Sequence, residues 1–323
     1  MRDGRNFMNL PSNPSGTIIA VFVHVHYLDV WTELSELIAE RIDLPFRLIV
    51  TTSLQDAVLA RPHTPHMTSM DVIAVENRGR DILPFIRALA EIRDFDIGLK
   101  LHTKKSPQRS DGTAWRNEIY RQLMPSRGAT AELVAAMAAE RRVGFVAPDG
   151  FSLSVRPWIF GNGPVMSAAM ATLGRELTED ELDDVFFAAG SMFWFRREGL
   201  AALANERLQA LFEAEEGQLD GTVAHAVERL FPVVIGRQGL VSTSRAALLA
   251  AQPGAPVDTI VALAREHADI PNVYFPAAGI AAGAEVAPSP PPTPSMSLVR
   301  ALARACPAPL RRLLRKLLMR GAH

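Results

Sequence analysis

Residues 96–106 read DIGLKLHTKKS, and this stretch decides both the fold class and the place of a site. The apolar pattern of DIGLKLH predicts a buried β-strand. The residues that follow bring a histidine, a threonine, two lysines and a serine to the end of that strand. So many cations and hydrogen-bond donors at one strand end favour a binding site for an anion.

Strands and helices alternate along the first half of the chain. Apolar runs predict strands at 17–25, 46–52, 71–75 and 96–102, and helical spacing predicts helices at 29–40 and 81–92, with a short helix at 54–61. Farther along we expect a strand at 143–148, one β-prone stretch at 186–196, and helices at 113–123, 129–141, 221–230 and 257–268. The alternation predicts an α/β, Rossmann-like fold with a mostly parallel sheet flanked by helices.

Composition excludes several classes of protein. The 323 residues carry a net charge of −1, so the chain lacks the broad positive charge of nucleic-acid-binding proteins. The single cysteine, Cys306, excludes an internal disulfide and a cysteine-based metal site. No secretory signal and no spanning segment are expected, because no window is long and apolar enough. We expect a cytoplasmic protein that is soluble or peripheral to the membrane.

The sequence predicts four parts. A flexible N-terminus (1–16) precedes an α/β domain (17–283), a Pro-rich linker (284–296) and a basic amphipathic tail (297–323). In the tail, leucines at helical spacing alternate with arginine and lysine, a pattern typical of helices that lie on a membrane surface. Packing of this helix on the domain or on a partner protein is the alternative.

Polar residues gather after three of the predicted strands. If these strands are parallel neighbours, their carboxyl ends meet at one edge, where ligands of open α/β sheets bind. Asp81 is a candidate N-cap of the next helix. Solvated surface turns are the alternative, and no dinucleotide or P-loop glycine motif is present. The candidate residues for a diphosphate are Asn77, Arg78, Gly79, Arg80, Asp81, Lys100, His102, Thr103, Lys104 and Lys105; His24, His26 and Tyr27 follow the first strand.

A second group of polar residues surrounds the predicted helix at 221–230. Asp220 is a candidate N-cap, and a carboxylate just before such a helix can act as a general base. His225, Glu228 and Arg229 lie about one turn apart on this helix. The alternative is a capped helix with an intrahelical ion pair in which His225 packs against the domain. A metal site at His24 and His26 is the weaker interpretation, since Asp29 is the only carboxylate close by.

Five separate motifs follow one another along the chain in the order found in a known family. ENRGRD (76–81), KLHTKKS (100–106), Trp115-Arg116, GSMFWFR (190–196) and DGTVAHAVER (220–229) resemble the rhamnan synthesis F family over residues 17–245. This resemblance implies a glycosyltransferase for rhamnose-rich polysaccharides or lipopolysaccharide O-chains. The layout is also similar, more distantly, to GT-A nucleotide-sugar transferases.

The resemblance implies roles for these residues. The donor would be dTDP-L-rhamnose, the acceptor a lipid-linked glycan and the reaction inverting, with Asp220 as base and the nucleobase near His24, His26 and Tyr27. His102-Thr103-Lys104 replaces the usual Asp-x-Asp, which implies that cations substitute for a divalent metal. The alternatives are a metal held elsewhere, with His102 as a ligand, or an inactive site. Acceptor or supporting roles would fall to Trp115, Arg116, Trp194, Arg196, His225, Glu228 and Arg229, with Phe193 beside Trp194. Packing in the core is the alternative for Phe193 and Trp194.

Two further functions remain open at this stage. The same pocket could serve a non-catalytic module that binds a glycan or a partner in a polysaccharide assembly complex. The basic strand ends could also serve a phosphate-ester hydrolase or a nucleotide-binding protein. Nothing in the chain indicates a nucleic-acid partner.

Overall fold

The computed structural model describes residues 16–105, 111–216 and 220–270. The chain divides into two units, Met1–Pro276 and Ala277–His323, and every described residue belongs to the first. The expected linker at 284–296 and the basic tail at 297–323 lie outside the described residues, as do residues 1–15 of the expected N-terminal segment. The description below therefore concerns the α/β unit.

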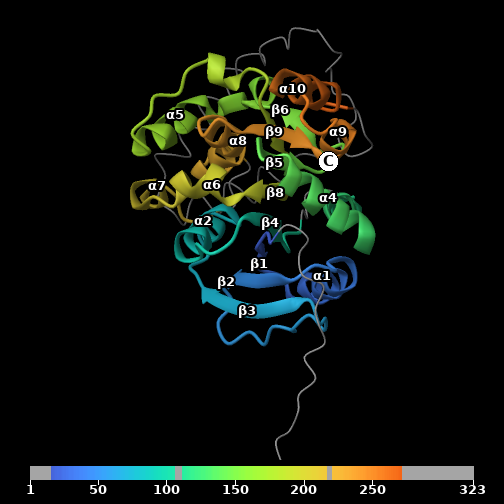
Figure 1. The fold of residues 1–323 in the computed structure, drawn as a ribbon. Helices are drawn as coiled ribbons and strands as arrows, with labels where there is room; N and C mark the ends of the chain where they lie inside the picture. Colours follow the sequence, from blue (N-terminus) through green and yellow to red (C-terminus); the bar gives the residue numbers. More distant parts are fainter. Residues whose placement is uncertain (1–15, 106–110, 217–219, 271–323) are drawn as a thin grey trace, which may run out of the picture. The chain divides into compact units, whose positions relative to one another are not determined.

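A seven-stranded sheet forms the centre of this unit (Figure 1). Only β8 runs antiparallel to its neighbours, so the predicted α/β fold with a mostly parallel sheet is confirmed. In spatial order the strands are β3 (Met67–Ala74), β2 (Phe46–Thr52), β1 (Ile19–Val25), β4 (Ile97–His102), β8 (Phe193–Arg196), β5 (Val143–Ala147) and β9 (Val241–Ser244).

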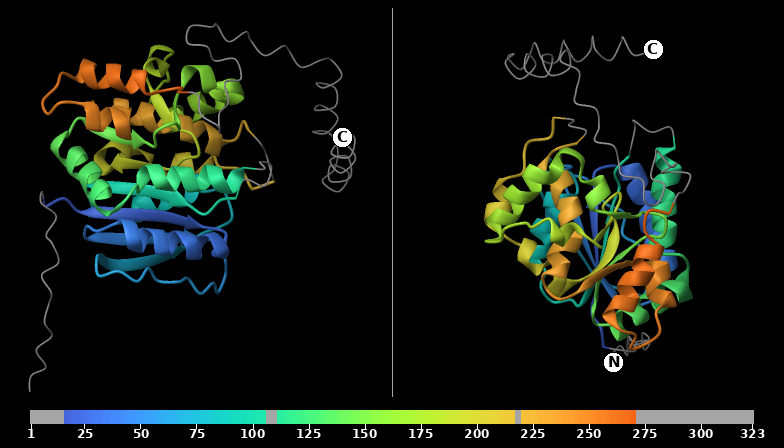
Figure 2. Two further views of the ribbon diagram at one scale, coloured as in Figure 1. Left: turned by 90° about the vertical axis from the view of Figure 1, so that its right-hand side faces the viewer. Right: turned by 90° about the horizontal axis from the view of Figure 1, so that it is seen from above.

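Helices cover both faces of the sheet, and each face has its own hydrophobic core (Figure 2). One core is built with α2 (Ile82–Glu91), α5 (Gly163–Thr172) and α8 (Val223–Gly236). The other is built with α1 (Leu28–Arg41), α3 (Gly112–Leu123), α4 (Arg127–Ala139), α9 (Arg245–Ala250) and α10 (Val257–Glu266). Successive residues of β1 serve opposite cores, as strand geometry requires: Phe22 faces the first and Val21 and Val23 the second. Two short helices, α6 (Arg197–Leu200) and α7 (Glu206–Ala210), follow β8.

Strand order reverses direction at β1. This strand pairs with β2 on one side and with β4 on the other, both in parallel. In sheets of this kind, a crevice opens outside the carboxyl ends of the two strands at the reversal. His24 and His102 are register partners near these ends. The fold therefore places the ends of both strands, and the loops after them, at the position where α/β sheets bind ligands.

One predicted element is wrong, and one β-prone stretch contains two separate strands. Residues 54–61 form no helix: Val58 is 92% exposed, and of this segment's apolar residues Leu59 is the one that packs, partly buried, against the core with α1. The stretch 186–196 is not continuous: β7 (Phe186–Ala188) pairs with β6 (Ser152–Ser154), and a turn separates β7 from β8. Gly190 and Ser191 in this turn have φ values of 92° and 56°, which no strand residue adopts.

Gly79 offers a test of the packing at the start of α2. Its φ is +65°, and a Cβ there would lie 2.5 Å from the Leu83 Cβ and from the Phe212 ring. Gly174 has a similar φ of +70° with open space around it. We expect Gly79→Ala to lower the free energy of unfolding by about 1–3 kcal/mol more than Gly174→Ala, because only Gly79 adds overpacking to the shared backbone strain. Urea unfolding measures both, and equal losses would contradict this packing.

Candidate functional site

A buried ion pair lies under the crevice. The Lys100 Nζ of β4 is 2.6 Å from the Asp81 Oδ2 at the start of α2. Nζ also donates to the Ser191 carbonyl at 2.6 Å and to its hydroxyl at 2.9 Å. These contacts use the three hydrogens of an ammonium group. Lys100 is 1% exposed, so its predicted role in contacting the donor diphosphate does not fit the structure.

The same pair corrects the predicted cap of α2. The Asp81 side chain makes no capping hydrogen bond, since Lys100 holds it. Burial raises the pKa of Asp81, but the charges of Lys100, His102 and Lys104 and the hydrogen bond from Lys100 together outweigh it. The pKa of this carboxyl therefore lies well below its usual value. Burial in turn lowers the pKa of Lys100, opposed by the charge of Asp81. The pair thus joins α2, β4 and the turn before β8.

His102 is fixed through both ring nitrogens. Nε2 lies 2.8 Å from the Gly190 carbonyl and donates to it, which leaves Nδ1 to accept the backbone N–H of Lys104 at 3.2 Å. Burial lowers the pKa of His102 to about 4, so the ring is neutral at neutral pH. Because neither nitrogen is available, the geometry disfavours the alternative in which His102 binds a metal. Among the described residues, no three histidine, cysteine or acidic side chains converge as a metal site.

The loop after β1 is tied to the end of β4. The Thr103 hydroxyl accepts the backbone N–H groups of His26 at 2.9 Å and Tyr27 at 3.0 Å. His24 is buried and its Nδ1 lies 3.1 Å from the Thr51 hydroxyl, with burial lowering its pKa to about 4. Thr103 and His24 are therefore structural supports. His26 and Tyr27 stay at the surface of the crevice, with their rings 4.8 Å apart edge to face.

The remaining predicted cations have different surroundings. Arg78 donates to the carbonyls of Phe212 at 2.7 Å and Ala210 at 3.3 Å, so it anchors a later segment of the chain. Lys105 pairs with Asp29 and lies 5.0 Å above the Tyr27 ring.

Lys104 is half-buried, and its ammonium makes no hydrogen bond within the described part of the chain. Its positive charge is close enough to contribute to lowering the pKa of both Asp81 and His225. It therefore lies between the end of β4 and the start of α8. Asn77 is exposed in the turn before Arg78.

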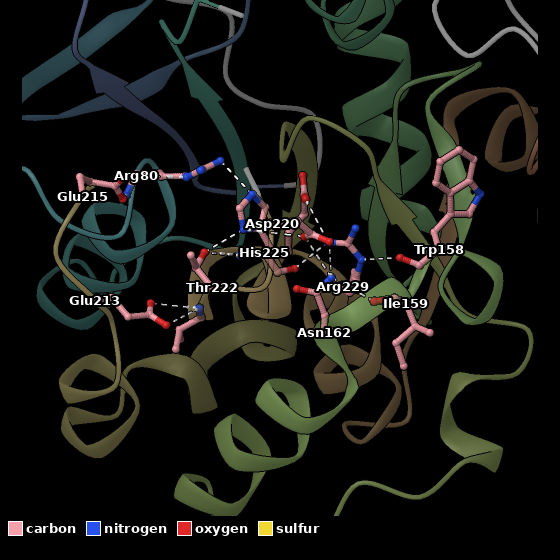
Figure 3. A network of polar contacts seen from close by, with 12 residues as sticks. Arg80, Trp158, Ile159, Asn162, Glu213, Glu215, Asp220, Thr222, His225 and Arg229 are labelled. Atoms are coloured by element: carbon pink, nitrogen blue, oxygen red, sulfur yellow. Dashed lines mark hydrogen bonds and ion pairs between the residues drawn. The ribbon is translucent and has the colours of Figure 1, made fainter. Parts of the chain in front are cut away.

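A polar network connects the 76–81 turn to the start of α8 (Figure 3). Arg80 Nη1 is 2.9 Å from His225 Nε2, and His225 Nδ1 is 2.8 Å from the Thr222 hydroxyl. A guanidinium only donates, so Nε2 accepts and Nδ1 carries the proton. Burial and then the charge of Arg80 lower the pKa of His225 to about 4. Arg80 adopts a left-handed φ of 55°, and its backbone N–H donates to Glu215.

Asp220 is held open to solvent beside this network. Thr222, not Asp220, is the N-cap of α8, and its hydroxyl accepts from His225 N. The predicted capping role of Asp220 is therefore wrong. Its carboxylate instead accepts from Asn162 Nδ2, at 3.1 Å to Oδ1 and 3.3 Å to Oδ2, and lies 3.9 Å from His225 Nδ1. The Asp220 side chain is 42% exposed, as a group that meets a substrate must be.

Three of these supports have no clear signal in the sequence. Asn162 is fully buried in a 3-10 turn before α5, in an unremarkable GNGP stretch. Glu213 accepts from the Val223 N–H at the start of α8, and Glu215 accepts from the Arg80 N–H. A cluster of acidic residues was visible at 213–216, but its contacts depend on how the chain returns to the 76–81 turn.

The aromatic residues proposed for the acceptor are in the core. Phe193 and Trp194 are 0% exposed, and the Trp194 indole donates to the Leu123 carbonyl at 2.9 Å. An acceptor wall made of these two rings does not fit, and the alternative of core packing is confirmed. Trp115 is 9% exposed, and its ring would meet a Cβ at Gly190 at 2.5 Å, so it packs on the 190–191 turn.

Of the charged residues with predicted acceptor or supporting roles, two lie away from the site and two lie beside it. Arg196 pairs in register with Ile97 at the amino end of β4, away from the crevice, and donates to the carbonyls of Val143 and Met137. Arg116 is buried 3.7 Å from Glu33 on α1. Glu228 and Arg229 do lie beside the site.

Glu228 and Arg229 of α8 hold neighbouring segments through hydrogen bonds to the backbone. Glu228 accepts the Gly190 N–H at 3.1 Å, and burial raises the pKa of its carboxyl. Arg229 donates to the carbonyls of Trp158 and His225 at 2.6 and 2.8 Å. Arg80, Lys104 and Asp220 therefore lie around His225 at the start of α8, near the end of β4.

The fold and this crevice define an α/β protein with a polar site at the strand reversal. A profile of the rhamnan synthesis protein F family matches residues 8–238, most of the chain, and the chain belongs to this family. Two curated relatives are 36% identical over 231 residues. They are the uncharacterised proteins WxcX of Xanthomonas campestris pv. campestris, strain B100 and strain ATCC 33913. Membership implies a role in polysaccharide biosynthesis.

The match covers different shares of the two proteins. It takes in 70% of this chain but 32% of each WxcX sequence, so the aligned part is about a third of the relatives' length. None of the helices in the described ranges has the length and apolar character to cross a membrane.

The buried ion pair is open to a direct test. Lys100→Met leaves the Asp81 carboxylate buried without a partner, and we expect a loss of about 3–5 kcal/mol in the free energy of unfolding. Adding Asp81→Asn removes the uncompensated charge and should recover part of that loss. Denaturant unfolding of the two single variants and the double variant measures the coupling. Additive losses would show that the two side chains do not interact.

The neutral histidine predicts a pH dependence of stability. In the unfolded chain His102 gains a proton near pH 6.5, whereas in the folded protein its pKa is about 4. The unfolded state therefore binds more protons in this window, and stability falls as pH drops from about 6.5 toward 4. We expect His102→Gln to reduce this slope by up to about 1.4 kcal/mol per pH unit. Urea unfolding across the window measures both slopes, and identical slopes would contradict the buried neutral ring.

Proposed function

We propose that this chain is an inverting glycosyltransferase that moves L-rhamnose from dTDP-L-rhamnose to a growing, lipid-linked surface polysaccharide. The observation that carries the proposal is the exposed carboxylate of Asp220, fixed by Asn162 beside a crevice that holds Arg80 and Lys104. A base and a pair of cations facing one crevice are what displacement of a nucleoside diphosphate requires. Family membership supports the polysaccharide as the product class.

In this mechanism Asp220 takes the proton of an acceptor hydroxyl. The hydroxyl oxygen then attacks the anomeric carbon, and the bond from that carbon to the diphosphate oxygen breaks with inversion. Negative charge grows on the leaving diphosphate, and Lys104 and Arg80 stabilise it. His26 and Tyr27, with Lys105 above the Tyr27 ring, form the wall for the nucleobase. We propose that cations serve this reaction without a divalent metal.

Fewer cations are available to contact the donor diphosphate than the sequence predicted. Lys100 and Arg78 are committed to Asp81 and to backbone carbonyls, so they position the turn and do not contact the donor. Contact of the 297–323 tail with the inner face of the cell membrane is proposed from its sequence pattern, and it would keep the enzyme beside a lipid-linked acceptor.

One observation favours a second function. Carboxylates already accompany several cations of the crevice: Asp29 pairs with Lys105, and Glu215 lies 3.8 Å from Arg80 Nε. Such neutralisation weakens attraction for a diphosphate and suits a non-catalytic module that binds neutral glycans or a partner. Nucleotide binding separates the two functions, because only the transferase needs it.

The test begins with calorimetric titration of the full chain with dTDP, UDP, GDP and their sugar nucleotides, with magnesium, manganese or EDTA. We expect one nucleotide to bind in EDTA. Lys104→Ala should weaken that binding about 10- to 100-fold, the loss of one charge-assisted contact. Metal-dependent binding would overturn the cation mechanism, and no binding of any nucleotide would favour the glycan-binding module.

Asp220→Asn tests the base. The variant keeps the shape and the Asn162 neighbour but cannot take a proton, so we expect kcat for transfer to fall about 10²- to 10⁴-fold. Donor affinity should stay at the wild-type value, because Asp220 faces the acceptor. Transfer to a membrane-extracted lipid-linked glycan, followed by mass spectrometry, measures the rate. A variant with full turnover would exclude Asp220 as the base.

A further inference from the structure

Phe160 is an exposed aromatic residue on a strained backbone. Its side chain is 57% exposed, and its φ is 44°, a conformation that bulky residues rarely adopt. Holding a non-glycine residue there costs about 1 kcal/mol or more, and such strain gathers at functional sites. A large ring held open to water on such a backbone is therefore a candidate contact for a ligand.

The surroundings of Phe160 keep its ring in one place. The Trp158 ring meets it edge to face, with centroids 5.6 Å apart and an interplanar angle of 88°. The Arg229 guanidinium lies 5.9 Å from the Phe160 centroid, and Arg229 Nε donates to the Trp158 carbonyl. The ring is therefore preorganised, so a ligand that binds it loses little additional freedom.

The same segment holds the carboxylate of the site. Asn162, two residues after Phe160, donates to both oxygens of Asp220. Two residues span at most about 7 Å, so the Phe160 backbone lies about one sugar ring from the Asn162 backbone. The Asn162 Oδ1 is buried and has no hydrogen-bond partner among the described residues. The Asn162 amide is thus oriented so that its nitrogen donates to Asp220, and its buried oxygen is left without a hydrogen bond.

We propose that Phe160, braced by Trp158 and Arg229, is a subsite for a pyranose ring of the acceptor glycan. The apolar C–H face of the sugar would lie on the exposed aromatic ring, and its hydroxyl edge would point toward Asp220. This subsite rests on the proposed function for the identity of its ligand as an acceptor. It replaces the acceptor wall expected from Phe193 and Trp194, which the core covers.

The test compares three variants of the full chain with wild type. Phe160→Asn removes the ring but keeps a residue that tolerates a left-handed backbone, so it should fold at least as well. Phe160→Tyr keeps an aromatic face. Val58→Ala trims another highly exposed apolar residue, 92% exposed between β2 and β3, as a matched control.

Binding of a rhamnose trisaccharide, followed by saturation-transfer and chemical-shift NMR titration, is the readout. We expect the dissociation constant to rise about tenfold in Phe160→Asn, comparable to loss of one aromatic stacking contact. Phe160→Tyr and Val58→Ala should bind as wild type does. Wild-type affinity in Phe160→Asn, or no binding of the trisaccharide by wild type, would overturn the subsite.

A nucleotide titration of the same samples keeps the subsite and the transferase distinct. If the trisaccharide needs Phe160 while no nucleotide binds any sample, the subsite stands and the transferase fails. If a nucleotide binds normally while Phe160→Asn leaves the trisaccharide unaffected, the transferase stands and the subsite fails.

Discussion

The contact between Lys100 and Asp81 is the constraint on which the site depends. It is buried, and it joins three segments: the end of β4, the start of α2 and the Gly190–Ser191 turn. A buried pair of this kind contributes little net stability compared with apolar packing, but removal of one partner is strongly destabilising. The pair therefore holds the geometry of the crevice floor. Lys104 and Arg80, which are only partly buried, are the cations that remain near the surface.

Three neutral histidines also hold neighbouring segments of the chain in place. His24, His102 and His225 each have a pKa lowered to about 4, chiefly by burial, and each ring is hydrogen-bonded to the protein. A neutral ring can accept at one nitrogen and donate at the other, which links a strand end to a turn without adding charge. Positive charge at the crevice thus comes from lysine and arginine side chains and not from these histidines.

The Asp220 carboxylate is positioned by residues that are distant in sequence. Asn162 and Asp220 are 58 residues apart, and Arg80 and His225 are 145 apart. Each pair joins a turn on one side of the sheet to the start of α8. Because the helix N-cap is Thr222, Asp220 keeps its oxygens for the crevice. The strained turn that carries Phe160 contains Asn162 as well, and the proposed glycan subsite rests on that placement.

Local sequence determined the fold class and the position of the candidate site at the carboxyl edge of the sheet. Period-two apolar runs alternating with helical ones specify a parallel sheet, and the polar residues after the strands mark its carboxyl edge, since both are properties of neighbouring residues. Only the tertiary structure decided which polar residue does what. Lys100 and Lys104 are four residues apart, yet one is buried in an ion pair and the other is only partly buried near the start of α8. Burial depends on what the rest of the chain places beside a residue, and Asn162 reaches Asp220 only after folding.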